Sequence, residues 1–277
     1  MSCPAVTFTL GFIFLRLDLF TKSKKGKKTL DCEPPQFSPS LKKAIEAESS
    51  SGSPAAVLKA WRAGKNIAPT PSDLLKNVVQ AFIDLEPQAI VTEFIEHIQR
   101  HAMALKNSRT AVAVLNVVAR AGHIEVMADF WSAFQRTLEI APTYQMYECI
   151  LGGYAAVGDD AKVKATIEEM RQRRMKPTAR GCSIIIKGFL KNNMVDACLE
   201  QLLSMKSQSF IVPPFAVTQF VRIAGDAGRI TEAFNAIEGS LALPAEAAAH
   251  LLEDACRHSN VDFARRVEKA AREALSP

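Results

Sequence analysis

The segment Tyr144–Thr178 reads YQMYECILGGYAAVGDDAKVKATIEEMRQRRMKPT and contains one complete structural unit. Its first half carries an apolar stripe with helical spacing (i, i+3, i+4, i+7), formed by Tyr147, Ile150, Leu151 and Tyr154. Gly158 accepts the left-handed backbone conformation that often ends a helix, and Pro177 cannot continue a helix interior. The segment therefore predicts a helix, a short turn, a second helix and a loop closed by proline.

The same pattern recurs along the chain with a period of about 35 residues. Residues that accept a positive φ recur with separations of 36, 35, 35 and 32 residues, at Gly122, Gly158, Asn193, Gly228 and Asn260. Prolines at 142, 177, 213 and 244 form a second series, with separations of 35, 36 and 31. Since both series agree on one period, we predict helix–turn–helix units at about 108–143, 144–178, 179–213, 214–244 and 245–277.

A weaker unit is expected at about 71–107, with an apolar stripe in each half. Before it, Ala55–Arg62 is interpreted as a lone second helix closed by Pro69, and Ser49–Ser53 as a loop or linker. A single helix pair of this length cannot bury its apolar faces alone, so neighbouring units must stack. The prediction is an all-α solenoid of stacked helix–turn–helix repeats that forms one elongated domain over about 41–277.

Residues 1–40 are predicted to be a disordered leader, with a targeting segment as the alternative. The apolar run Phe8–Phe20 has only 13 residues and includes Arg16 and Asp18, whereas a membrane-spanning helix needs about 20 apolar residues. A secretory signal would carry its basic residues before the apolar run, but here the lysines follow it. We therefore predict no membrane span.

The formal charge of +5 lies entirely within residues 1–28, so the remaining 249 residues sum to zero. A surface that binds polyanions must then come from local clustering of charge. Residues 144–191 contain nine Lys and Arg against five Asp and Glu, whereas residues 214–277 contain seven against nine. Any such surface is therefore expected on the middle units.

Motifs for catalysis or metal binding are missing from the sequence. The six cysteines form no CxxC pair, which argues against a zinc knuckle or a disulfide framework and fits a thiol-reducing compartment. His97 and His101 have a spacing that could chelate a metal, but a surface or partly buried pair is the preferred interpretation. Since no GxGxxG, P-loop or GxSxG motif occurs either, we predict no catalytic centre, no cofactor and no metal.

The segment Tyr144–Thr178 resembles a pentatricopeptide repeat, with its Gly turn, a second helix ending in an EEM triplet and a basic loop closing in Lys-Pro. The phrase AGRITEA at 227–233 is similar to that family's turn and second-helix start, and the resemblance covers about 170 residues from Ser108 onward. It implies single-stranded RNA binding in organellar RNA processing, stability or translation. The implied compartment is a mitochondrion or chloroplast, while cytoplasm and nucleus stay open.

In that family each repeat reads one base, chiefly through its fifth and last residues. The matching pairs here are Glu148 with Thr178, Ser183 with Pro213, Thr218 with Pro244, and Val112 with Thr143. The family's pairs usually end in Asp, Asn or Ser, so every last-position residue here departs from the pattern. The resemblance thus implies RNA binding with little sequence choice, or a repeat array that serves another partner.

Basic residues near helix ends are candidate phosphate contacts. Arg120, Lys191 and Arg257 lie at the ends of three first helices, just before the turn. A second group ends the second helix of the unit 144–178 and comprises Arg171, Arg173, Arg174 and Lys176. Cations at these places also stabilise a helix through its dipole, so a purely structural role is the alternative. For the whole chain, the alternative function is a helical-repeat adaptor that binds a protein partner.

Overall fold

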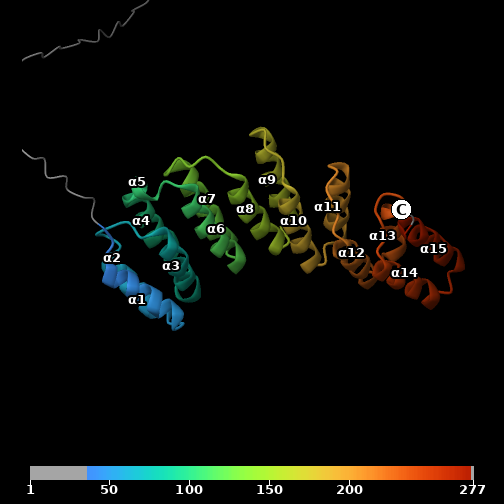
Figure 1. The fold of residues 1–277 in the computed structure, drawn as a ribbon, viewed down its shortest axis with the longest axis horizontal. Helices are drawn as coiled ribbons and strands as arrows, with labels where there is room; N and C mark the ends of the chain where they lie inside the picture. The colour runs from blue at the N-terminus through green and yellow to red at the C-terminus, as the bar shows by residue number, and fades with distance from the viewer. Residues whose placement is uncertain (1–35, 276–277) are drawn as a thin grey trace, which may run out of the picture. The chain divides into compact units, whose positions relative to one another are not determined.

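The computed structural model describes residues 36–275, in which all regular elements are helices and no strand occurs (Figure 1). The predicted leader over 1–40 lies almost wholly outside this range, so it stays a prediction. None of the described helices is long and apolar enough to cross a membrane.

Five helix pairs follow one another from Ser108 onward. Their first helices are α6 (Ser108–Ala121), α8 (Tyr144–Ala156), α10 (Ala179–Lys191), α12 (Pro214–Asp226) and α14 (Ala245–Arg257). Their second helices are α7 (Ile124–Arg136), α9 (Asp160–Gln172), α11 (Val195–Ser207), α13 (Ile230–Ile237) and α15 (Val261–Leu275). Each first helix contacts the next first helix, and each second helix packs on its own first helix. The predicted all-α stack of helix–turn–helix repeats is confirmed.

The turn within each pair places one residue in the left-handed region, always the fifteenth residue of the pair. Gly122, Gly158, Asn193 and Gly228 occupy this place with φ between 54° and 78°, as predicted. In the last pair the prediction of Asn260 is wrong, because Ser259 has the positive φ of 51°. Asn260 instead caps α15, where its side-chain oxygen accepts a hydrogen bond from the Phe263 amide at 3.1 Å.

The N-terminal part is less regular. It comprises α1 (Pro39–Ser50), α2 (Pro54–Gly64), α3 (Ser72–Leu85), the π-helix η1 (Ile90–Phe94), α4 (Ile95–Arg100) and α5 (Ala102–Leu105). The interpretation of Ala55–Arg62 as a lone helix is wrong, because α1 precedes α2 and packs against it. Helix α1 also includes Ser49 and Ser50, so the predicted Ser49–Ser53 loop is shorter. Ile45 is the one residue of α1 that is fully buried, which leaves no apolar stripe to recognise.

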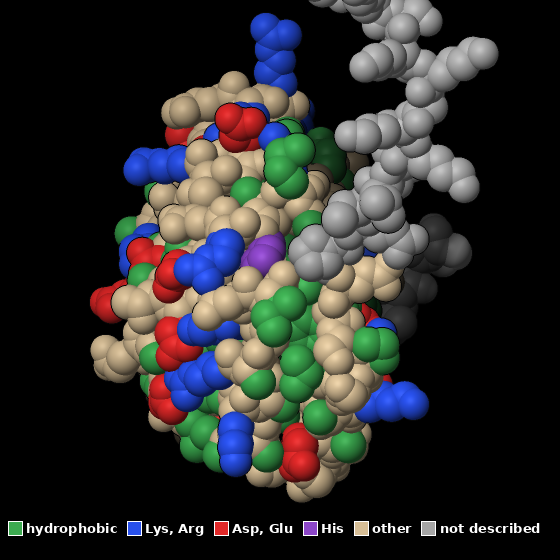
Figure 2. All heavy atoms as spheres, turned by 90° about the vertical axis from the view of Figure 1, so that its left-hand side faces the viewer, with side chains coloured by type: hydrophobic (Ala, Val, Ile, Leu, Met, Phe, Trp, Pro, Cys, Tyr) green, Lys and Arg blue, Asp and Glu red, His purple; other side chains and the backbone are tan. Residues whose placement is uncertain are grey.

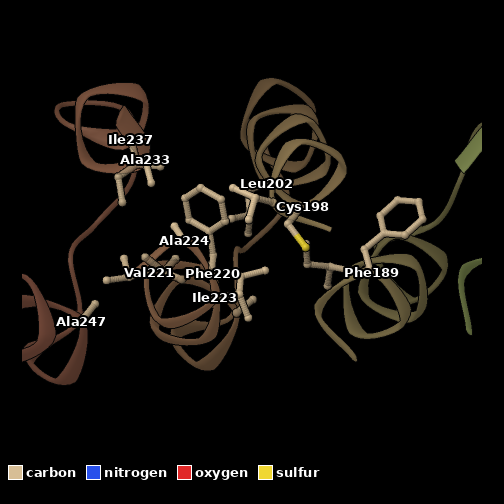
Figure 3. Close-up of a cluster of buried hydrophobic side chains, with 14 of the residues drawn as sticks. Phe189, Cys198, Leu202, Phe220, Val221, Ile223, Ala224, Ala233, Ile237 and Ala247 are labelled. Atoms are coloured by element: carbon tan, nitrogen blue, oxygen red, sulfur yellow. The ribbon is translucent and has the colours of Figure 1, made fainter. Parts of the chain in front are cut away.

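The core runs between the two layers of helices. Figure 3 shows part of it, where Cys198 and Leu202 of α11 face α12, and Phe220 lies among side chains from neighbouring helices. Phe220, Leu202 and Cys198 are fully buried. Because this apolar contact continues from one unit to the next, the stack is held together by burial between units rather than within one pair.

A buried polar network joins α2, the following loop and α4. The Trp61 indole N–H donates to the Thr70 hydroxyl at 2.9 Å, and that hydroxyl lies 2.9 Å from His97 Nε2. His97 Nδ1 donates to the Lys65 carbonyl at 2.8 Å, and His101 Nε2 lies 3.0 Å from the same oxygen. Burial lowers the pKa of His97 to about 4, so its imidazole is neutral at physiological pH. The two histidines are therefore engaged in this network of internal hydrogen bonds.

The N-terminal end of the stack carries mixed charge. Figure 2 shows acidic and basic side chains beside one another on this face. The Glu93 carboxylate forms ion pairs with Arg62 Nη2 at 2.6 Å and with Lys65 Nζ at 2.5 Å. These cations lower the pKa of the Glu93 carboxyl. This pairing leaves little net positive charge to attract a polyanion here.

Candidate nucleic-acid interface

Helices α6, α8 and α10 expose one face made of their second, fifth, ninth and thirteenth residues. These positions are three or four residues apart, so they line up along one side of a helix. On α6, α8 and α10 they are Arg109, Val112, Asn116, Arg120, Gln145, Glu148, Gly152, Ala156, Arg180, Ser183, Lys187 and Lys191. We call this the first-helix face.

A groove of about 610 Å³ runs across this face from α6 over α8 to α10. Its charged lining consists of Arg120, Arg180, Lys187 and Glu148, which is three cations against one anion. Its remaining lining is uncharged and includes the amide side chains of Asn116 and Gln145. We call it the first-helix groove, and its chemistry suits an extended anionic ligand.

Glycines in α8 and α10 let the two helices approach closely beneath the groove. A Cβ on Gly188 would lie 2.5 Å from the backbone carbonyl carbon of Ala155, which is closer than real atoms come. A Cβ on Gly152 would lie 2.9 Å from Cγ2 of Ile184. Gly188 therefore lets the backbones of α8 and α10 approach closely, and Gly152 leaves room for the Ile184 side chain.

Glu148, the fifth residue of its unit, is held by its neighbours. The Thr178 hydroxyl donates to Glu148 Oε1 at 2.7 Å, and Arg180 Nε lies 3.4 Å from Oε2. Thr178 also caps α10, since its hydroxyl accepts from the Gly181 amide at 3.0 Å. The side chains of this predicted base-reading pair thus bind each other and the helix end.

The other fifth-position hydroxyls bond to their own helices. Ser183 donates to the Ala179 carbonyl at 2.9 Å and lines the groove, whereas Thr218 donates to the Pro214 carbonyl at 3.2 Å and is buried. The last-position residue Thr143 caps α8, where it accepts from the Met146 amide at 3.3 Å. Fifth and last residues are therefore largely used for helix structure.

Of the three candidate phosphate contacts at the ends of first helices, only Arg120 lines the first-helix groove. Lys191 and Arg257 are not part of its lining. Arg257 lies on α14, three helices along the first-helix layer from α8, and pairs with Glu253 at 3.3 Å. Residues at equivalent places in the sequence thus differ in whether they line the groove.

The basic run at the end of α9 lies on the second-helix layer. Arg171 and Lys176 line a hollow of about 300 Å³ that also includes residues of α11. Arg171 pairs with Glu168, and Arg173 Nε lies 3.3 Å from Glu169. Arg174 adopts a positive φ of 59° at the start of the following loop. This group is distinct from the first-helix groove.

Two groove cations, Arg180 and Lys187, were missing from the sequence-based site. They lie at the second and ninth positions of α10, and Lys187 Nζ is 5.6 Å from the centre of the exposed Phe215 ring. Extending the helical spacing backward from the thirteenth position would have identified them, because 13, 9, 5 and 2 share one face.

Cys149 is the single thiol in the lining of the groove. Burial raises the pKa of the Cys149 thiol to about 11, so the nucleophilic thiolate is scarce at neutral pH. Within residues 36–275, no three His, Cys, Asp or Glu side chains gather to hold a metal ion. The geometry supports binding of an anionic chain by charge and shape.

Comparison with known proteins gives a structural likeness. No protein-family profile matches the sequence, and no curated protein is similar to it. The pentatricopeptide repeat protein PPR10 from maize superposes with a TM-score of 0.51 and 21% identity, covering 87% of this chain. Two structures of PPR10 in complex with an 18-nucleotide psaJ RNA element, one of them a cysteine-to-serine variant, give TM-scores of 0.49 at 21% identity and cover 85% of this chain.

The present chain spans about a third of PPR10, with 35% of that protein covered in the first superposition and 37% in the other two. An identity of 21% relates folds rather than activities. The helix pairs, the turn position and the first superposition agree on the architecture. The chain therefore has the helical-repeat fold of pentatricopeptide repeat proteins.

Proposed function

We propose that this protein binds single-stranded RNA along the first-helix groove, mainly through phosphate contacts and with little choice of sequence. The observation that carries the proposal is the first-helix groove, which spans three successive first helices and is lined by Arg120, Arg180 and Lys187. Phosphate contacts demand positive charge but little directional geometry. The likeness to the pentatricopeptide repeat fold and the resemblance of the sequence support RNA as the polyanion.

Weak sequence choice follows from the state of the fifth and last residues. Glu148 and Thr178 are bonded to each other, and the Thr218 hydroxyl is buried against its own helix. Hydrogen-bond donors and acceptors used internally are not offered to base edges. The proposal therefore assigns affinity to the cations and only a small part to base recognition.

The test is a salt titration of binding to two unrelated 12-nucleotide RNAs, followed by fluorescence anisotropy. Each neutralised phosphate on a single strand contributes roughly −0.7 to the log–log slope. Replacing Arg120, Arg180 and Lys187 by alanine should therefore flatten the slope by about 2 and weaken both RNAs alike. A matched control replaces Arg171, Arg173 and Lys176, which removes the same charge from the second-helix layer.

The control should keep most of the wild-type slope, because surface charges more than about 10 Å away are screened near 0.1 M salt. Equal slopes for the groove variant and wild type would remove the groove from the binding site. A strong preference for one RNA would contradict the weak sequence choice.

The cellular setting is part of the proposal and rests on the resemblance alone. We propose a role in RNA processing, stability or translation in a mitochondrion or chloroplast. Fractionation of cells that express the full chain with a carboxy-terminal tag tests it. Recovery in the organelle after protease treatment is expected, and recovery only in the cytosol would contradict it.

A further inference from the structure

The unit 214–244 contains a shortened second helix. Helix α13 has 8 residues, whereas α7, α9 and α11 each have 13. Five missing residues correspond to about 7 Å of helix. After Ile237 the chain leaves the helix, with a positive φ of 71° at Gly239, and continues as a loop to Pro244.

An apolar pocket of about 630 Å³ opens beside this loop. One wall is the loop after α13, with Leu241 and Leu243, and the opposite wall is the loop after α11, with Phe210 and Ile211. Ile211 is 89% exposed and lines this pocket together with other apolar side chains. The pocket therefore presents apolar side chains beside the unit whose second helix is shortened.

The lining of the pocket also carries one positive charge. Lys206, in the last turn of α11, is the single charged residue of the lining. Within the described range it takes part in no ion pair. A phosphate chain would find one cation among apolar walls, whereas a carboxylate on an apolar ligand would match both features.

We infer that this pocket docks a short amphipathic helix of a partner protein, which supplies apolar side chains to the pocket and a carboxylate to Lys206. The partner helix would take the place of the helical turns that α13 lacks, since its neighbours already present helix-packing surfaces. Recognition of this kind places side chains spaced by three or four residues into an apolar groove. This site is independent of the first-helix groove and of RNA.

The experiment selects binders from a random 12-residue peptide library displayed on phage, using the full chain as bait and Ala242→Trp as counter-selection, and then tests the selected peptides on Ile211→Asp. Ile211 is exposed, so the substitution should leave the thermal melt followed by circular dichroism unchanged. Selected peptides are then measured individually by fluorescence anisotropy. We expect them to share an apolar pair with Asp or Glu within one helical turn.

Three variants test the mode of binding. Ala242→Trp fills the pocket from its exposed rim and Ile211→Asp makes it polar, and each should weaken binding about tenfold or more. Lys206→Glu should weaken acidic peptides and strengthen versions that carry lysine instead. Ile67→Asp, at another exposed isoleucine, is the matched control and should bind as wild type does.

Peptides that bind Ile211→Asp and wild type within twofold would overturn the docking site, as would a selection that enriches nothing. Insensitivity to the charge swap at Lys206 would overturn the acidic partner. RNA binding by Ile211→Asp should stay at the wild-type level, so a failure of this site is distinguishable from a failure of the first-helix groove.

Discussion

Replacing Gly188 by alanine should force α8 and α10 apart. The added Cβ would lie 2.5 Å from the backbone carbon and 2.7 Å from the backbone oxygen of Ala155. Backbone atoms cannot rotate away as a side chain does, so the helices must separate by about 1 Å to restore normal contact. This overpacking costs about 1–3 kcal/mol, against a gain of about 1 kcal/mol from better helix propensity. We expect a net loss of up to about 2 kcal/mol of unfolding free energy, centred on about 1 kcal/mol.

Gly225→Ala in α12 is the matched control, because the change in unfolding free energy should have the opposite sign. There the nearest atom to an added Cβ is the flexible Ile230 Cδ1 at 3.4 Å, an ordinary contact. The propensity gain should remain, for up to about 1 kcal/mol of stabilisation. Urea unfolding followed at 222 nm measures both variants, read as shifts of the midpoint at constant slope. A Gly188→Ala variant that is stabilised as much as Gly225→Ala would refute the close contact of α8 and α10.

Three further predictions concern protonation, the turn and the groove. As pH falls below about 6.5 the unfolded His97 binds a proton, whereas the folded residue, with a pKa of about 4, stays neutral. The free energy of unfolding is therefore lost between about pH 6.5 and pH 4, by about 2 kcal/mol at pH 5. Urea midpoints at pH 7.5 and pH 5 measure this loss. A loss in His97→Asn as large as in wild type would contradict the assignment to His97. Gly158→Val should lower the melting temperature, because a β-branched residue resists the φ of 78°; an unchanged melt would show that this turn is wrong. Glu148→Gln should raise RNA affinity about twofold at low salt, since one charge about 8 Å from a phosphate is worth about 0.5 kcal/mol in water; an unchanged affinity would place the RNA away from Glu148.

The repeat could be predicted from the sequence because single residues mark where its helices end. Positive-φ turns favour Gly or Asn, and prolines are excluded from helix interiors, so both features can be recognised from single residues. The error at Asn260 arose because Asn also favours N-caps. Pro213 and Pro244 are 31 residues apart, and the same separation counted from the turn residue Gly228 leads to Ser259.

The site was harder to predict because it depends on which layer a residue faces. Arg120 and Arg171 both end helices and look alike in sequence, but one lines the first-helix groove and the other a hollow between second helices. The internal bonding of Glu148 with Thr178 joins residues 30 positions apart and leaves no pattern in the sequence. The pocket beside α13 was likewise hidden, although the unit length of 31 residues indicated a shortened helix.

The most direct test of RNA binding on the first-helix layer is photochemical crosslinking of a 4-thiouridine 12-nucleotide RNA to the full chain, with the crosslinked peptides mapped by mass spectrometry. We predict crosslinks within 109–120, 145–156 and 180–191, the segments that carry the first-helix face. They should disappear together when Arg120, Arg180 and Lys187 are replaced by alanine. Crosslinks concentrated within 160–176 or 195–207, on the second helices α9 and α11, would contradict RNA binding in the first-helix groove.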